Sequence, residues 1–358
     1  MKKRILHVID YMGPGGAQTL MRKYFDHEIH NKEIVLFSLR QNADRLPVNH
    51  EQVLTSRSRR RYSTIPLLEI RDIILKYNVE IIHCHLFRSQ VFGWVIKKLF
   101  FPNIKIIFHE HGQILQNDWY YDLAFKWLIP DLWIAVSVVA ESALRKKLNV
   151  EKLIVVHNFI CLKNYTSTEK HLLREDFRKY LNISKDDFLM GFIGRLAKVK
   201  GCEDALYVLK RLDSRYKLAL VGSGVMLDKL QSLAKKLSIS DRVYFLGYKP
   251  NVQDVLYGID LILVPSRSES FGLIALEAQA ACVPVVASDI LGFKNLLHDE
   301  VDCLLYPSGK VDQIEKKVRL ISSNDSVART LKKNGLINSR RFQISQFVDA
   351  LDKIHNTL

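Results

Sequence analysis

The sequence predicts an α/β protein with two Rossmann-like domains that face a cleft. Short runs of β-branched and apolar residues alternate with helical patterns along most of the chain, which is typical of βαβ units in parallel sheets. The run Leu261-Ile262-Leu263-Val264 lacks polar/apolar alternation, as expected of a strand covered on both faces. A length of 358 residues suits two domains of ordinary size.

In the first half, strands and helices are expected to alternate. The expected strands are 4–9, 34–39, 79–83, 104–109, 132–137 and 153–157, and the expected helices are 17–27, 65–77, 89–100, 119–129 and 139–148. Ligands of open α/β sheets bind at the carboxyl ends of the strands, so functional residues should lie in the loops that follow them.

The second half repeats the pattern after a polar stretch at 164–170 that suits a linker. We therefore predict one domain over 1–160 and another over 161–358, whose mostly helical tail can pack back on the first. The expected strands are 188–194, 217–222, 242–246, 260–265 and 283–287, and the expected helices are 169–181, 201–212, 225–237, 252–257 and 272–281.

The chain is strongly basic, with 53 Lys and Arg against 38 Asp and Glu, which suggests a polyanionic partner. The basic residues are dispersed, and neither a basic helix, paired nucleic-acid-binding aromatics nor zinc-finger spacing is present, so we expect no nucleic acid partner.

The five cysteines form no CxxC pair, which favours reduced thiols and a cytoplasmic protein. No apolar run is long enough to span a membrane.

Two features of the first half follow predicted strands. The loop Gly13-Pro14-Gly15-Gly16 opens a helix, where backbone N–H groups attract phosphate. It is not the GxGxxG of nicotinamide-dependent oxidoreductases. Histidines stand two residues apart at His83 and His85 and again at His109 and His111. With no nearby carboxylate or second ligand pair, structural or cleft-lining roles are favoured and no metal is expected.

The second half carries the stronger signals. Arg195 follows a buried strand and Lys200 begins the next helix, so two cations and a helix N-terminus are available to a diphosphate. Glu269 precedes a turn, and Glu277 lies in an otherwise apolar helix, where a carboxylate is costly unless it is paired or binds a ligand.

In this order the motifs resemble those of the retaining family-4 glycosyltransferases, which have the GT-B fold and use nucleotide sugars. The resemblance spans about residues 4–310. Its motifs are Gly13–Gly16, His111-Gly112, Val136-Ser137, Arg195 with Lys200-Gly201, Gly222-Ser223-Gly224, and the Glu-x7-Glu pair Glu269 and Glu277.

The resemblance implies roles for these residues. Arg195 and Lys200 would bind the donor diphosphate, Glu277 the ribose hydroxyls, and Glu269 would face the donor sugar. His111 would lie next to the transferred sugar and orient it. The remaining donor-binding positions implied are Gly15, Gly16, Gly222, Gly247, Tyr248, Phe271, Gly272 and Leu273.

These roles predict a retaining enzyme that moves a hexose or N-acetylhexosamine to a glycan acceptor in bacterial surface polysaccharide synthesis. The co-substrate would be a UDP-sugar in preference to a GDP-sugar, with no other cofactor. The alternatives are an inverting GT-B enzyme and, in another class, a basic nucleic-acid-binding protein.

A basic segment and two aromatic stretches further suggest that the first domain docks on the anionic inner face of the plasma membrane. The segment contains Arg57, Arg59, Arg60 and Arg61, and the stretches are 94–101 and 119–129. The acceptor would then be lipid-linked.

Overall fold

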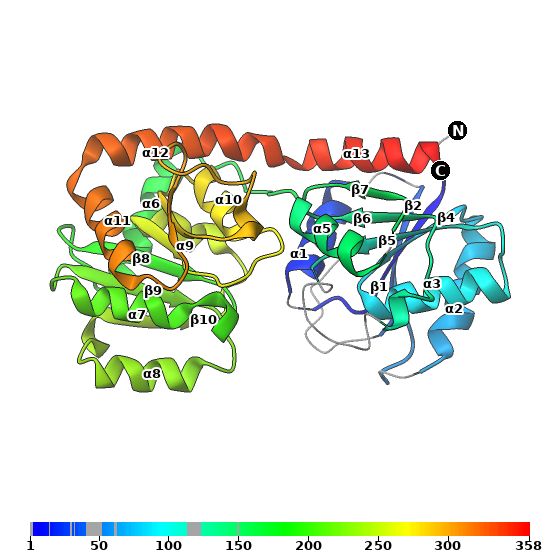
Figure 1. Ribbon diagram of the computed structural model, residues 1–358, viewed down its shortest axis with the longest axis horizontal. Coiled ribbons are helices and arrows are strands. Elements are labelled where there is room, and N and C mark those ends of the chain that lie inside the picture. Colours follow the sequence, from blue (N-terminus) through cyan, green and yellow to red (C-terminus); the bar gives the residue numbers. More distant parts are fainter. Residues whose placement is uncertain are drawn as a thin grey trace. The chain divides into compact units, whose positions relative to one another are not determined.

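A computed structural model divides the chain into two compact units. One comprises Met1–Phe159 with Ile344–Leu358, and the other Ile160–Gln343. Figure 1 shows a sheet and its covering helices in each unit, and each unit is described by itself. The structure describes residues 3–13, 15–28, 31, 33–40, 52–60, 63–112, 123–148 and 150–358.

The first unit contains a seven-stranded parallel sheet in the order β3-β2-β1-β4-β5-β6-β7. All six expected strands are present, and the short edge strand β3 is an addition. The strands are β1 (Ile5–Ile9), β2 (Ile34–Ser38), β3 (Val53–Thr55), β4 (Ile81–His85), β5 (Lys105–Glu110), β6 (Leu132–Ala135) and β7 (Leu153–Val155).

Helices cover both faces of this sheet. The C-terminal helix packs on this unit, where Phe347 contacts Phe159 with ring centroids 4.9 Å apart. The helices are α1 (Gly16–His27), α2 (Ile65–Tyr77), α3 (Phe87–Leu99), α5 (Val138–Lys147) and α13 (Ile344–Thr357). Of the stretch expected to be helical at 119–129, residues 119–122 lie outside the described residues, and the described remainder is helical only at 123–125.

The second unit contains a six-stranded parallel sheet in the order β10-β9-β8-β11-β12-β13. This is the doubly wound order, and it reverses between β8 and β11. The strands are β8 (Phe188–Ile193), β9 (Tyr216–Val221), β10 (Val243–Gly247), β11 (Leu261–Val264), β12 (Val285–Asp289) and β13 (Leu304–Pro307). The expected two-domain α/β fold with parallel sheets is confirmed.

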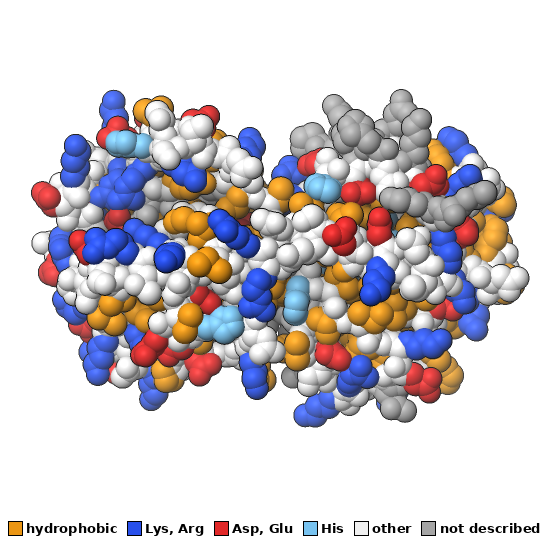
Figure 2. All heavy atoms as spheres, turned by 90° about the horizontal axis from the view of Figure 1, so that it is seen from above, with side chains coloured by type: hydrophobic (Ala, Val, Ile, Leu, Met, Phe, Trp, Pro, Cys, Tyr) orange, Lys and Arg blue, Asp and Glu red, His pale blue; other side chains and the backbone are white. Residues whose placement is uncertain are grey.

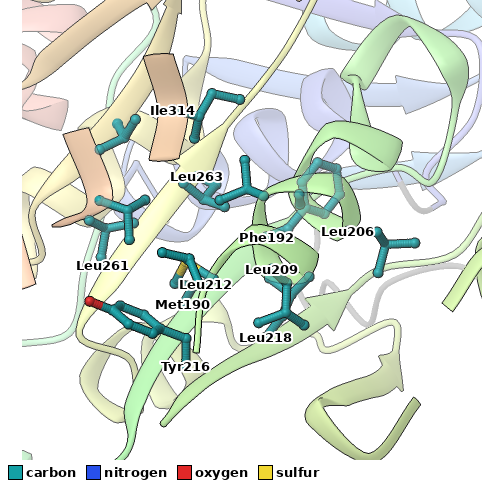
Figure 3. Close-up of a cluster of buried hydrophobic side chains, with 14 of the residues drawn as sticks. Met190, Phe192, Leu206, Leu209, Leu212, Tyr216, Leu218, Leu261, Leu263 and Ile314 are labelled. Carbon is teal, nitrogen blue, oxygen red and sulfur yellow. The ribbon is translucent and has the colours of Figure 1, made fainter. Parts of the chain in front are cut away.

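The second sheet is buried on both faces, as the unbroken apolar run in β11 predicts. Leu261 and Leu263 pack with Met190 and Leu218 on one face (Figure 3), and Ile262 and Val264 join a separate cluster on the other. The helices are α6 (Ser167–Tyr180), α7 (Cys202–Arg211), α8 (Leu227–Lys236), α9 (Val252–Gly258), α10 (Leu273–Ala280), α11 (Val311–Ser323) and α12 (Asp325–Ser339), with short 3-10 turns at Lys198–Lys200, Ser240–Arg242, Leu291–Phe293 and Arg340–Phe342.

The surface charge is spread over the molecule. On the face drawn in Figure 2, lysine and arginine side chains are interspersed with acidic ones and do not form a stripe. Among the described residues, none of the helices combines the length and the apolar character that a bilayer span requires.

Candidate active site

An ion pair lies at the switch point of the second sheet. The Lys200 ammonium is 2.6 and 2.7 Å from the two carboxylate oxygens of Glu269, which also accepts a hydrogen bond of 2.7 Å from the Ser266 hydroxyl. Lys200 follows β8 and Glu269 follows β11, the two strands between which the strand order reverses. Glu269 is 8% exposed and Lys200 26%, so the pair lies at the edge of the solvent.

Glycines hold the loops of this edge against one another. A Cβ atom on Gly222, after β9, would lie 1.9 Å from the carbonyl oxygen of Gly194, after β8. A Cβ atom on Gly201 would lie equally close to the carbonyl oxygen of Pro265, which precedes Glu269 in the loop after β11. These backbone approaches leave no room for a side chain, so the glycines position the ion-paired loops rather than merely permit a turn.

The cations of this edge differ in their environment. Arg195 is exposed and makes no side-chain hydrogen bond or ion pair within the described part of the chain. Its guanidinium is therefore available to a ligand. Arg267, by contrast, is bound to the buried carboxylate of Asp204 at 2.7–2.8 Å, and its backbone N–H donates to the carbonyl of Val199.

The N-terminus of α10 completes this edge. Gly272 caps the helix with a φ of 70°, and a Cβ atom there would lie 2.2 Å from the ring of Phe293, so both conformation and space require glycine. Phe271 is buried against Phe342, which leaves its backbone, not its ring, for ligand contact. Leu273, the first residue of α10, and Glu277, at the start of its second turn, are half-buried.

Gly247 and Tyr248 end β10 next to the glycine turn after β9. The carbonyl of Gly247 accepts a hydrogen bond of 2.8 Å from the N–H of Gly222, and Tyr248 is 53% exposed. The structure therefore brings Lys200 into contact with Glu269 and Gly222 with Gly247, and places Arg195 directly after Gly194, on which Gly222 packs.

In the first unit, Gly15 and Gly16 begin α1. Both are exposed, and a Cβ atom on Gly16 would meet no atom of the described residues within 4 Å, so this part of the helix N-terminus has space for a ligand. His111 follows β5, and its Nε2 lies 3.0 Å from Nδ1 of His85. Burial lowers the pKa of His111 to about 4, so the imidazole is neutral at pH 7.

One residue of this unit escaped the sequence analysis. Asp10 follows β1 at the switch point of the first sheet, and its carboxylate accepts hydrogen bonds from the backbone N–H groups of Ser89 (2.7 Å) and Arg88 (3.3 Å) at the start of α3. Burial raises its pKa to about 6. A lone acid directly after the first strand was the available signal.

Family models match most of the chain in two pieces. The model described as Glycosyltransferase Family 4 matches residues 25–164, and the model described as Glycosyl transferases group 1 matches residues 174–336. The second match includes all the candidate residues of the second unit.

Individual proteins agree with these matches. The chain is 25% identical over 295 residues to an uncharacterized glycosyltransferase of Methanocaldococcus jannaschii, covering 80% of this chain and 78% of that protein. It is 27% identical over 299 residues to the O-antigen biosynthesis glycosyltransferase WclY of Escherichia coli, covering 78% and 79%. The crystal structure of Anabaena HepE in complex with UDP and glucose matches 99% of this chain and all of that chain, with a TM-score of 0.85 and 18% identity. The chain is thus a glycosyltransferase with the GT-B fold, whose N-terminal part matches the family 4 model and whose C-terminal part matches the group 1 model.

Proposed function

We propose that this enzyme transfers a hexose or N-acetylhexosamine from a nucleotide sugar to a glycan acceptor with retention of the anomeric configuration. The observation that carries the proposal is the Lys200–Glu269 pair at the switch point of the second sheet, next to the N-terminus of α10. Ligands of doubly wound sheets bind at this point.

Breaking the bond between sugar and diphosphate builds negative charge on the departing phosphate. Lys200 and the exposed Arg195 supply two fixed cations after β8, and the N-terminus of α10 supplies backbone dipoles. Glu269 holds Lys200 in place before the donor arrives, since both of its oxygens contact the ammonium. In this proposal these groups stabilise the leaving diphosphate.

The sugar and nucleoside ends of the donor would meet other residues. His111 is neutral at pH 7, so it serves as a hydrogen-bonding partner that orients the sugar and not as a charge. Glu277 accepts hydrogen bonds from the ribose, and Gly247 and Tyr248 flank the base. Gly15 and Gly16 approach the donor with backbone N–H groups, where the missing side chain of Gly16 leaves space although Gln18 packs over Gly15.

For the donor we propose a UDP-sugar in preference to a GDP-sugar, because the HepE structure contains UDP. For the acceptor we propose a lipid-linked glycan of bacterial surface polysaccharide, because WclY is an O-antigen biosynthesis enzyme. The enzyme would then work in the cytoplasm at the inner face of the plasma membrane.

Nucleotide binding and product analysis test the reaction. Calorimetry should show UDP binding more tightly than GDP, and UDP more tightly than UMP, because Arg195 and Lys200 contact the second phosphate. Arg195→Ala and Lys200→Ala should remove most of the difference between UDP and UMP. If UDP binds most tightly, UDP-sugars serve as donors. NMR should then show that the new bond in the product has the same anomeric configuration as the donor. An inverted anomer would favour the alternative mechanism, and equal affinity for UDP and UMP would refute the site.

Membrane docking rests on the basic segment after β3. Arg57, Arg59 and Arg60 are exposed at the carboxyl edge of the first sheet, with 94% of the Arg57 side chain accessible. Arg61 lies outside the described residues. Because the ligand-binding edge of such a sheet is also the carboxyl edge, a bilayer bound here would present a lipid-linked acceptor to that edge.

The most exposed apolar side chains of the two aromatic stretches lie elsewhere on this unit. Leu99 and Trp127, 69% and 73% exposed, precede β5 and β6 and therefore lie at the amino edge of the sheet. The two segments meet there, since Lys97 and Asp131 form an ion pair of 2.6 Å. These two exposed side chains are thus separated from the arginines by the length of the sheet. The docking proposal therefore rests on the arginines and not on these aromatic stretches.

Vesicle co-sedimentation tests this docking. Anionic vesicles should bind the wild-type enzyme in a salt-sensitive way, and changing Arg57, Arg59, Arg60 and Arg61 to Ser should weaken binding by about 100-fold or more, at about 1 kcal/mol per arginine. The matched control changes Lys316, Arg329, Lys332 and Lys333, four exposed cations of α11 and α12, to Ser. Equal losses in both variants, or binding that salt does not affect, would refute docking through this segment.

A further inference from the structure

A cluster of histidines is buried in the first unit, apart from the ion pair in the second. Six of the chain's 12 histidines belong to it, and five of these are at most 2% exposed. The six are His7 in β1, His83 and His85 in β4, His109 in β5, His111 directly after β5, and His355 in α13.

The sheet register assembles this cluster. Residues two apart in a strand face the same side, so His83 and His85 share one face of β4. His7 pairs with His83 across β1 and β4, and His85 pairs with His109 across β4 and β5. The C-terminal helix α13 adds His355, whose ring meets His7 and His83 edge-on.

Three of these imidazoles converge. One nitrogen from each of His83, His85 and His109 lies within 4.8 Å of the other two, and Nε2 of His83 is 3.2 Å from Nδ1 of His109. In a tetrahedral zinc site, metal–nitrogen bonds of about 2.0–2.1 Å place two ligand nitrogens about 3.3 Å apart. Burial lowers the pKa of all three histidines, which keeps them in the neutral form that binds metals.

Outer histidines hold two of these rings. Nδ1 of His83 lies 3.1 Å from Nε2 of His355, and Nδ1 of His85 lies 3.0 Å from Nε2 of His111. Metal-binding histidines characteristically hydrogen-bond through the nitrogen that faces away from the ion, which fixes tautomer and ring orientation. With those bonds on the Nδ1 side, Nε2 of His83 and Nε2 of His85 face other imidazoles of the cluster, at 3.2 Å from Nδ1 of His109 and 2.9 Å from Nδ1 of His7. An ion would replace these two contacts.

We propose that His83, His85 and His109 bind one transition-metal ion of the zinc class, which ties β4 to β5 and, through His355, to the C-terminal helix. Imidazole ligands favour Zn²⁺ and its neighbours in the first transition row. A second convergent set, His7, His83 and His355, shares His83. Complete loss of the ion in His355→Gln with full retention in His109→Asn would assign it to that set instead. The sequence analysis expected no metal because it found no nearby carboxylate or second ligand pair for either pair of histidines. The pairing of β4 with β5 brings the two pairs together.

Metal content of the full-length enzyme tests the proposal. The chain is produced without a polyhistidine tag in zinc-supplemented medium and, separately, refolded from denaturant with Co²⁺, since a fully buried site is loaded as the chain folds. Elemental analysis should find about one ion per chain, and bound Co²⁺ should give the intense visible absorption of four-coordinate geometry. A wild-type enzyme that holds far less than one ion by both routes would overturn the proposal and leave the cluster as a hydrogen-bonded array of imidazoles.

Variants locate the ion. His83→Asn and His109→Asn should lose it, and His355→Gln should weaken its binding roughly 10- to 100-fold, because His355 supports a ligand without being one. His171→Asn is the matched control, because His171 is exposed in α6 of the second unit. Full metal content in folded His83→Asn and His109→Asn would overturn the assignment. If those variants fail to fold, the wild-type stoichiometry still decides.

Discussion

Lys200 and Glu269 are 69 residues apart in the chain, yet the ammonium of one lies 2.6 and 2.7 Å from the two carboxylate oxygens of the other. Adjacent strands bring them together, since β8 and β11 pair at the centre of the second sheet. The contact couples an inferred diphosphate-binding cation to an inferred sugar-facing acid. Substituting either residue therefore removes the ion-pair partner of the other.

Lys200→Ala should lower both activity and stability, and combining it with a change at Glu269 should show that the two losses have different causes. The single variant should lose about 100- to 1,000-fold in kcat, the usual loss when one preorganised charge-stabilising group is removed. It should also lose about 1–3 kcal/mol of unfolding free energy, because the buried Glu269 carboxylate loses its cation.

Adding Glu269→Gln to Lys200→Ala should restore stability but not activity, as measured by chemical denaturation beside steady-state kinetics. Lys198→Ala is the control, because Lys198 is exposed in the same 3-10 turn. Loss of activity in Lys198→Ala equal to that in Lys200→Ala would argue against a specific role for the ion-paired lysine.

Two glycine substitutions should act in different ways. Gly222→Ala should destabilise the second unit by about 1–3 kcal/mol, because its Cβ atom would lie 1.9 Å from a backbone carbonyl oxygen. Gly16→Ala should leave stability nearly unchanged, because the space around it is open, and yet reduce activity where donor phosphate approaches the start of α1. Thermal unfolding and kinetics on both variants check this. An active Gly16→Ala enzyme would remove the α1 terminus from the donor site.

Periodicity predicts the strands and helices of this chain well because both sheets are parallel and buried. Runs such as that in β11 are apolar throughout, and the intervening helices carry one apolar face. The strands that escaped prediction are β3 and β13, which lie at the edges of their sheets, where β3 is only partly buried and β13 ends in a proline.

The candidate site was predictable as a set of loops but not as a set of contacts. Arg195 and Lys200 could be named because cations follow a buried strand, whereas the Lys200–Glu269 pair depends on β11 lying next to β8 across a crossover. The histidine cluster shows the same limit. His83 and His85 are visible as a spaced pair, but His355 reaches them only because α13 returns to the first unit.

Glu277→Ala should remove discrimination between ribose and deoxyribose. If the half-buried carboxylate accepts a hydrogen bond from the 2′-hydroxyl, the wild-type enzyme should bind UDP about 10- to 100-fold more tightly than 2′-deoxy-UDP, since a hydrogen bond to a charged group contributes about 1.5–3 kcal/mol. The variant should bind both nucleotides equally and weakly. Calorimetry with the two nucleotides checks this, and a preference retained by Glu277→Ala would place the ribose elsewhere.

Asp10 should make the stability of the first unit depend on pH. Its pKa is raised to about 6 in the folded protein, above the value of about 3.9 of an unfolded chain, so the folded state binds this proton more tightly. The resulting stabilisation is complete below pH 3.9 and is lost as the pH rises through 6. Relative to wild type, Asp10→Asn should therefore gain on the order of 2 kcal/mol between pH 4 and pH 8.

Denaturation of both proteins across this range isolates Asp10, because the histidines respond to pH in wild type and variant alike. Asp26→Asn, at an exposed position of α1, is the control and should track wild type at every pH. A constant difference between wild type and Asp10→Asn would mean that the hydrogen bonds from Ser89 and Arg88 stabilise the ionised carboxylate enough to offset its burial. The acid would then act as a fixed negative charge at the N-terminus of α3, where the helix dipole favours it.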